Sequence, residues 1–444
     1  MISIRSIYKV NILNDKGGRL HLELPAGVAD ILPEAAERFI ELRRTILITM
    51  AGWGYRPVQP PLIEHAEALA RALPDSDEEV SFYKMVDRLS GRVLSLRADF
   101  TPQLARIAAT RFAEAALPLR FFYEGPVVRH VPNLNGKRRE LHQAGAELMG
   151  VMDPEGDSET IAMMVDCLRA SGLEDFKVDV GQVEFFKGIF KDVELTPEAL
   201  YAITDAVKRK DLSDLENALE NAPISVAKKE LLSALPLLAG GSEVLDRASA
   251  LAESDHSKEA LSNLSDALAF VDKHGLGAYL TVDLGEIRGV DYYTGIIFEG
   301  FVHHVGTPLS RGGRYDGLVG AYGKTLPATG FSIDILSVAE ALSLQNQGAR
   351  PTRSGVFIIN FLDKRDEAIK LARTLRAEGV RASRDLVKRP LVESVAAAAE
   401  QNFAFAIALG AEGTPSGEAL LIDLQKGERR SAAIEELTGC LQNI

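Results

Sequence analysis

The sequence predicts an α+β protein, with an antiparallel sheet flanked by helices, a helical insertion and a small C-terminal α/β domain. Three observations support this. Strand-like runs follow one another in the first 180 residues, the stretch at about 186–274 is rich in Ala, Leu, Glu and Lys without a convincing strand, and strands alternate with helices after Gly355. We therefore expect a first domain at 1–345, a linker at 346–354 and a second domain at 355–444.

The first helix is predicted to begin at Pro33, because proline is well suited to the first turn, and to end at Gly52. The proline-rich "GYRPVQPPLIE" that follows must be extended. A Ser-Gly turn joins two strand-like runs in "DRLSGRVLSLRADFT", and "LPLRFFYEGPVVRH" and "ELHQAGAELMG" read as two more strands.

Asp157 or Ser158 is expected to cap the next helix, which ends near Gly172, and Thr196 followed by Pro197 predicts a helix start in the insertion. Strands return with "AYLTVDLG", "GIIFEGFVHH" and "ATGFSIDIL". In the last domain "GVFIIN", "VRASRDL" and "FAFAIALG" are strands separated by helices, and a short hairpin follows.

Composition narrows the class of protein. The chain has 444 residues, 46% hydrophobic and 25% charged, with a net charge of −13, which disfavours a protein that coats nucleic-acid duplexes. It has no run of about 18 apolar residues and no apolar signal segment at its start. Cys167 and Cys440 provide neither a disulfide framework nor metal-ligand spacing. We expect a cytoplasmic protein without membrane segments, metal or cofactor.

Two motifs are set aside. "GLVGAYGKT" resembles a phosphate-binding loop, but five residues instead of four separate its outer glycines and Pro327 follows where a helix should run. His303 and His304 occupy adjacent strand positions that face opposite sides, so a shared metal is not expected.

Polar residues recur at alternate positions in two other segments. In "LRADFTPQLAR", Arg97, Asp99 and Thr101 alternate and share one face of a predicted strand, where the carboxylate and the hydroxyl receive an ammonium group or the face is simply solvated. Gln143 and Glu147 alternate with Gly145 on the strand after the basic loop at 133–139, and Arg129 precedes that loop. A polar strand face is unusual against a core, so we predict a lined cleft.

These segments, with "RGVDYYTG" and "GGRYDGL", resemble the catalytic core of histidyl-tRNA synthetase, a class II synthetase fold, from "LPAGVADILP" to about Leu342 and weakly beyond. The resemblance implies a pocket for histidine. Its lining residues would be Asp99, Thr101, Arg129, Gln143, Glu147, Arg288, Tyr292, Tyr293 and Tyr315. Carboxylates would hold the α-amino group, and a carboxylate with tyrosine hydroxyls would pair both imidazole nitrogens.

The chain departs from the synthetase pattern where the nucleotide binds. Val131 stands at the acidic position that reads the adenine amine, and "DILS" at 334–337 replaces the segment ending in a phosphate-binding arginine. Loss of one transition-state donor typically slows a reaction by about 100- to 1000-fold. We therefore expect no catalytic residues and little adenylate chemistry.

This pattern is similar to the regulatory subunit of ATP phosphoribosyltransferase, which acts in the first step of histidine biosynthesis. That resemblance implies a short-form catalytic subunit as partner, free histidine as feedback effector, self-association as a dimer, and no tRNA. Histidine would bridge Asp99, Glu147, Arg288 and Tyr293 and close the loop at 285–295.

Two alternatives stay open. A divergent but active histidyl-tRNA synthetase would need Arg314, Lys137, Arg138 or Arg139 to replace the lost arginine. An inactive paralogue with another interaction role is the third interpretation.

Overall fold

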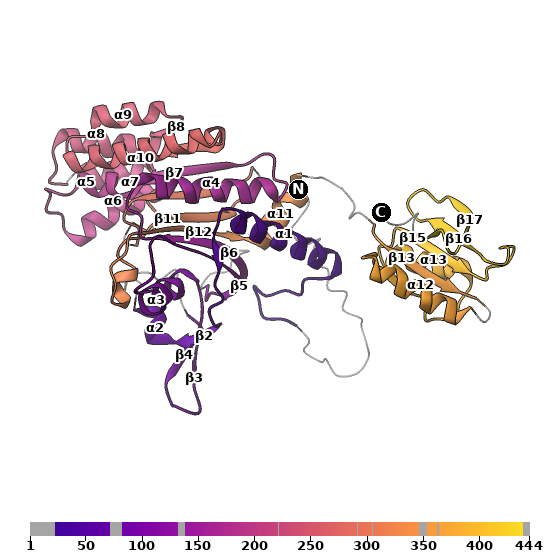
Figure 1. Cartoon of the computed structure of the whole chain (residues 1–444). Helices are drawn as coiled ribbons and strands as arrows, with labels where there is room; N and C mark the ends of the chain where they lie inside the picture. Colours follow the sequence, from indigo (N-terminus) through magenta and orange to yellow (C-terminus); the bar gives the residue numbers. More distant parts are fainter. Residues whose placement is uncertain are drawn as a thin grey trace, which may run out of the picture. The chain divides into compact units, whose positions relative to one another are not determined.

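The computed structural model describes residues 23–71, 82–131, 138–220, 222–290, 292–303, 305–345, 353–361 and 364–437. The chain divides into two compact units, Met1–Gln347 and Gly348–Ile444 (Figure 1). The predicted linker at 346–354 lies outside the described residues except at 353 and 354. Lys137, His304 and Cys440 also lie outside them.

A nine-stranded sheet forms the centre of the first unit. Its order is β1 (Arg56–Pro57), β5 (Leu119–Val128), β6 (Glu140–Met149), β12 (Ala328–Asp334), β11 (Ser310–Arg314), β10 (Ile296–Phe301), β7 (Lys177–Gln182), β9 (Leu280–Asp283) and β8 (Ala239–Gly240). Pairing from β5 to β7 is antiparallel, as predicted, but β1–β5 and β7–β9 are parallel, so the sheet is mixed. Strand β8 lies in the insertion, where no strand was expected. It consists of two residues that pair with β9 at the sheet edge, which is too short to produce a recognisable sequence pattern.

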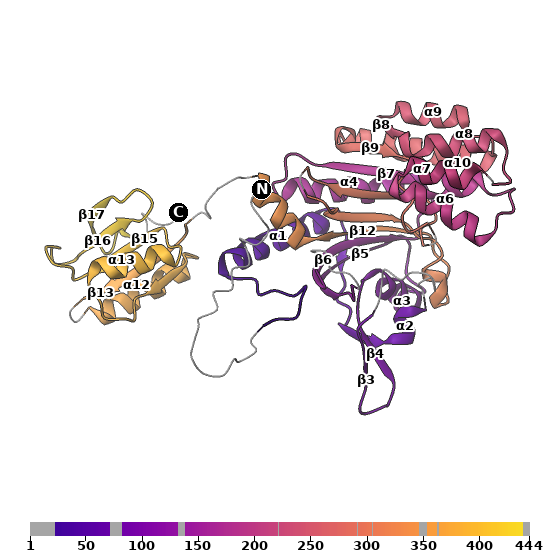
Figure 2. The ribbon, with the colours of Figure 1, turned by 180° about the vertical axis from the view of Figure 1, so that it is seen from behind.

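Three helices cover one face of this sheet: α1 (Pro33–Gly52), α4 (Pro154–Ala170) and α11 (Ile335–Gln345) (Figure 2). Helix α1 buries Leu42, Ile46 and Met50, which recur every four residues along one side. The prediction of the α4 cap was wrong by one turn. The side chain of Asp153 accepts a hydrogen bond from the backbone N–H of Glu155 at 2.9 Å.

The opposite face carries α3 (Thr101–Arg111), α2 (Ala66–Ala70) and a small sheet in the order β2 (Ile63–His65), β4 (Val93–Leu96), β3 (Lys84–Val86) (Figure 1). Strand β6 has a different role on each side. Ala144, Ala146 and Leu148 belong to the core on the helix side, whereas Gln143 and Glu147 alternate with them and face the α3 side.

The helical insertion gathers at the β8–β9 end of the sheet (Figures 1 and 2). Its helices and neighbours are α5 (Val183–Ile189), α6 (Pro197–Arg209), α7 (Leu212–Glu220), α8 (Val226–Ala234), α9 (Glu243–Leu251) and α10 (Asp255–Lys273). The predicted cap at Thr196 is confirmed, because its hydroxyl accepts a hydrogen bond from the backbone N–H of Ala199.

The second unit has its own five-stranded sheet, in the order β14 (Ala382–Arg384), β13 (Val356–Asn360), β15 (Phe405–Leu409), β16 (Glu418–Asp423), β17 (Arg429–Ala433). The first three strands are parallel and the last two form a hairpin. Helices α12 (Arg365–Ala377) and α13 (Leu391–Glu400) contribute to two separate cores. This is the α/β order predicted from the sequence.

Candidate functional site

The candidate site lies on the α3 side of the sheet, over glycines on three neighbouring strands. Gly145 of β6 pairs with Ser332 of β12, and Gly330, two residues before Ser332, pairs with Gly313 of β11. A β-carbon at Gly145 would collide with the Tyr123 hydroxyl, and one at Gly313 would lie 2.7 Å from the Tyr293 ring. These glycines therefore leave a floor on which polar side chains can converge.

Asp99 and Thr101 reach the site from the start of α3. The prediction that they share a strand face was wrong, because β4 ends at Leu96 and α3 begins at Thr101. Asp99 Oδ1 accepts hydrogen bonds from the backbone N–H groups of Phe100, at 2.6 Å, and Thr101, at 3.3 Å. The carboxylate satisfies free N–H groups at the helix start, which favours the turn over a continued strand.

Glu147 is the most buried acid of the site, with no exposed surface. Thr101 Oγ1 donates a hydrogen bond to Glu147 Oε1 at 2.7 Å, and the Tyr315 hydroxyl donates to Glu147 Oε2. Burial raises the pKa of Glu147 to about 8, although both hydrogen bonds oppose the shift. Glu147 forms no ion pair with another described residue, so nothing there offsets the cost of burying its charged form.

Gln143 and Tyr123 are two further buried polar groups of the site. Within the described part of the chain, Gln143 Oε1 is buried without a hydrogen-bond partner, and the buried Tyr123 hydroxyl has Thr101 as its polar neighbour. Buried polar atoms normally find partners, so an unpaired one calls for a ligand or ordered water. Tyr123 was not among the predicted site residues. It faces the pocket because it pairs with Gly145, a register that the sequence does not reveal.

Arg129 is the cation at the edge of this acidic pocket. Its Nε donates to the carbonyl of Ala98 at 2.8 Å, and its Nη2 forms an ion pair with Asp99 Oδ2 at 3.3 Å. The side chains of Arg129 and Asp99 remain 24% and 34% exposed, so a small ligand can reach both.

Tyrosines form one wall of the site. The ring of Tyr292 lies 5.9 Å from that of Tyr315 and 5.0 Å from that of Tyr293. Burial raises the pKa of all three hydroxyls, so they remain neutral donors at physiological pH. Lys187 of α5 donates to the Tyr293 carbonyl at 2.8 Å, which ties this loop to the insertion side.

Arg288 is the predicted pocket residue that the structure holds elsewhere. Its guanidinium forms ion pairs with Glu299 at 3.3 Å and Glu286 at 3.4 Å, and half of the side chain is exposed. Among the described residues, its guanidinium pairs with these two acids and not with Asp99 or Glu147.

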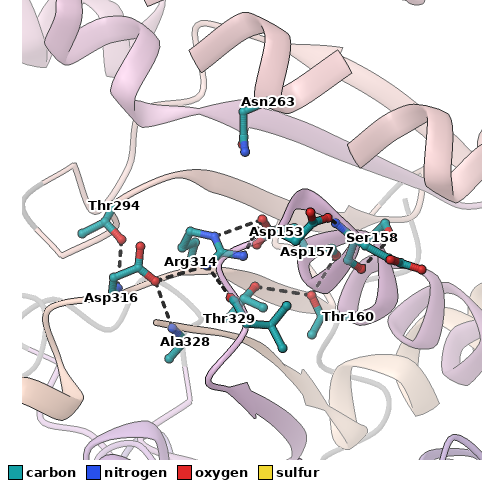
Figure 3. Close-up of polar contacts among 12 residues, drawn as sticks. Asp153, Asp157, Ser158, Thr160, Asn263, Thr294, Arg314, Asp316, Ala328 and Thr329 are labelled. Carbon is teal, nitrogen blue, oxygen red and sulfur yellow. Dashed lines mark hydrogen bonds and ion pairs between the residues drawn. The ribbon is translucent and has the colours of Figure 1, made fainter. Parts of the chain in front are cut away.

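Arg314 lies in a buried polar network instead of the pocket (Figure 3). Its Nε and Nη2 donate to Asp157 Oδ2 at 3.0 and 2.8 Å, and its Nη1 donates to Asp316 Oδ1 at 3.2 Å and to the carbonyl of Val151 at 3.0 Å. Arg314 is 5% exposed and Asp157 is fully buried. The pair joins β11 to α4, which explains why Asp157 is unavailable as a helix cap.

The basic loop predicted at 133–139 is described only at its last two residues. Arg138 Nη2 forms an ion pair with Glu340 at 2.8 Å, and its Nη1 lies 3.5 Å from Asp334 and 3.4 Å from Ser337. The Ser337 hydroxyl donates a hydrogen bond to Asp334 Oδ2 at 2.6 Å. The charge of Arg138 is therefore compensated by Asp334, which directly precedes α11, and by Glu340 within α11.

The arrangement suits a small molecule that carries hydrogen-bond donors and a positive charge. Asp99, Glu147 and Gln143 supply acceptors, tyrosine hydroxyls supply neutral donors, and Arg129 stands at the edge. In the described ranges no three metal-ligating side chains converge, and no helix there is long and apolar enough to cross a bilayer.

Known proteins have the same fold and similar sequences. The histidyl-tRNA synthetase family model matches residues 27–338, and the anticodon binding domain model matches residues 355–444. A histidyl-tRNA synthetase structure from Nostoc superposes with a TM-score of 0.82 over 96% of this chain and all of the other, at 22% identity, which shows the fold alone.

Relatives closer in sequence carry a different name. The ATP phosphoribosyltransferase regulatory subunit of Geobacter sulfurreducens is 38% identical over 91% of this chain and 92% of its own length. The subunit of Geobacter metallireducens is 39% identical over 93% and 94%. A Bacillus halodurans structure described as an ATP phosphoribosyltransferase regulatory subunit/histidyl-tRNA synthetase superposes with a TM-score of 0.77 at 29% identity, over 88% of this chain and 99% of the other. The chain therefore belongs to the family of ATP phosphoribosyltransferase regulatory subunits and carries a class II, histidyl-tRNA synthetase-like fold.

Proposed function

We propose that this chain is the non-catalytic regulatory subunit of ATP phosphoribosyltransferase and that it binds free histidine as a feedback effector. The observation that carries the proposal is the set of buried acceptors without partners: Glu147 has no cation, and Gln143 Oε1 has no donor, within the described residues. An amino acid with an ammonium group and an imidazole supplies the missing donors.

The pocket has a place for each group of histidine. The α-ammonium binds Asp99, whose carboxylate is partly exposed and already accepts a hydrogen bond from the backbone N–H of Thr101 at the start of α3. One imidazole N–H donates to Glu147, and a tyrosine hydroxyl donates to the other nitrogen. The carboxylate binds a guanidinium at the pocket edge, that of Arg129 or of a rearranged Arg288. An analogue that lacks either ring nitrogen would leave a buried group unpaired and bind more weakly.

A non-catalytic role is supported by the ion pairs that the arginines near the expected nucleotide position already form. Ser337 replaces the phosphate-binding arginine of the synthetase pattern, and Arg138, beside it, is neutralised by Glu340 and Asp334. Arg314 is buried in its pair with Asp157. Two of the three described candidates for a substitute arginine, Arg138 and Arg314, are thus already engaged in ion pairs, which disfavours adenylate formation; Arg139, whose Nε has no hydrogen-bond partner among the described residues, is the third.

A divergent synthetase remains the second candidate, because residues 355–444 match the anticodon binding domain model. The decisive experiment is histidine-dependent ATP–pyrophosphate exchange with the purified chain, with calorimetric titration of histidine in the same buffer. We expect histidine to bind without exchange. Clear exchange would show that another residue grips the phosphates and would reject the non-catalytic role.

The regulatory role is tested by adding the chain to a short-form catalytic subunit. We expect phosphoribosyltransferase activity that depends on this chain and is inhibited by histidine. With Glu147→Gln, activity should persist while inhibition should require about 10- to 100-fold more histidine. Inhibition at the same histidine concentration as in the wild type would place the effector elsewhere.

Self-association as a dimer through the α1 region is part of the proposal. Ile40 and Ile48 lie two turns apart on α1, and each is 59% exposed. Sedimentation should show a dimer that Ile48→Glu converts to a monomer. We also expect the assembly to be cytoplasmic and to bind no tRNA. A gel shift with tRNA tests the second expectation.

A further inference from the structure

One buried carboxylate beside the pocket has two arginine partners. Glu299 of β10 lies directly opposite Arg311 of β11 in the sheet register. Arg311 Nε approaches Glu299 Oε1 at 2.9 Å, and Arg288 Nη1 approaches Glu299 Oε2 at 3.3 Å. The Glu299 side chain is 9% exposed, whereas both arginines are about half exposed.

This trio lies on the same sheet face as the pocket. Arg311 pairs with Ser332 of β12, and Ser332 pairs with Gly145 of β6. Gly145 lies between Gln143 and Glu147 on the face that they share. A side chain that leaves Glu299 therefore moves over the floor of the pocket without crossing the sheet.

The two arginines are not equivalent. Arg311 is closer to the carboxylate and is held on a strand, whereas Arg288 follows a turn at Glu286 and makes longer contacts. Burial raises the pKa of Glu299, and Arg311 opposes that shift more than Arg288 does. Since an unpaired buried charge is costly, Arg288 can depart only because Arg311 remains.

We propose that Arg311 is a positioning residue that frees Arg288 for the carboxylate of the bound amino acid. The proposal rests on the proposed histidine site. In the free protein Arg288 is shared with Glu299. When the ligand binds, its carboxylate and Glu299 compete for the same guanidinium, and Arg311 alone compensates Glu299. The competition with Glu299 thereby lowers the affinity for the ligand, and Arg311 weakens that competition.

The proposal predicts opposite effects from two neighbouring substitutions. Arg311→Met leaves Arg288 as the only cation on Glu299, so the Kd for histidine should rise about tenfold. Arg311→Lys should restore most of the affinity, since an ammonium also pairs with Glu299. Glu299→Gln removes one of the two carboxylates that pair with Arg288, the other being Glu286, so the Kd should fall several-fold. A purely structural role would weaken binding in all three variants.

The test uses the full chain and two measurements. Calorimetry gives the Kd for histidine, with Arg209→Met as control, because the partners of Arg209 among the described residues are exposed acids of α6, α7 and the turn between them. Phenylglyoxal modification, followed by peptide mass mapping, gives the reaction rate of Arg288 without ligand. That rate should be lowest in Arg311→Met and highest in Glu299→Gln.

The two measurements separate the possible failures. If the wild-type chain binds no histidine but the modification rates follow the expected order, the proposed function is wrong and the arginine pairing stands. If histidine binds but Arg311→Met and Glu299→Gln shift the Kd in the same direction, or leave it unchanged, the positioning role is overturned. Equal modification rates at Arg288 in all variants overturn it as well.

Discussion

Replacing Glu147 by glutamine should stabilise the free protein and weaken histidine binding. The carboxyl group has a pKa of about 8 in the fold, against an ordinary value of 4.5, because it is fully buried. The folded state therefore binds more protons than the unfolded state between these values, so the free energy of unfolding falls as pH rises through that window. Each pH unit costs about 1.4 kcal/mol.

The size of the effect follows from the two pKa values. At pH 5 the buried carboxyl costs less than about 1 kcal/mol, and at pH 8 it costs about 4 kcal/mol, beyond which the loss levels off. Glutamine keeps the shape and has no charge, and the Thr101 and Tyr315 hydroxyls can rotate to pair with its amide. The variant should thus be more stable than wild type by about 4 kcal/mol at pH 8.

Urea unfolding of both proteins at pH 5 and pH 8 measures this difference, because the second unit contributes equally to each. Glu140→Gln, an exposed position on the same strand, is the control and should change stability by less than about 0.5 kcal/mol at either pH. Histidine affinity of Glu147→Gln should fall about 10- to 100-fold. A stability difference that does not change with pH would refute the reasoning, since Glu147 would then ionise normally in the free protein.

Two other substitutions test the site's framework. Arg314→Met should destabilise the first unit by about 3–5 kcal/mol, because it leaves Asp157 buried and unpaired, and Arg314→Met with Asp157→Leu should recover much of the loss in thermal unfolding. Gly313→Ala should displace the Tyr293 ring and crowd the Ile296 carbonyl, and so weaken histidine binding about tenfold in calorimetry. Gly317→Ala, which meets open space, should not weaken binding. Equal affinities of the two variants would show that the ring does not contact the ligand.

Local patterns predicted most of the elements and most of the residues gathered at the site. Proline at the start and glycine at the end delimited α1, and alternation placed Gln143 and Glu147 on one strand face. Alternation failed at Asp99 and Thr101, because the same spacing fits a turn into a helix whose first N–H groups need an acceptor. Short polar stretches do not distinguish these two cases.

The sequence by itself determined the order of elements, the family signatures and the chemical character of the pocket, because these depend on residue type and on spacing along the chain. Only the tertiary structure decided which charges meet. Arg288 turns to Glu299 rather than to the pocket, Arg314 is buried on Asp157, and the acceptor of Gln143 is left without a partner within the described residues. Each outcome depends on strand register and on packing between segments far apart in sequence, and no local pattern encodes either.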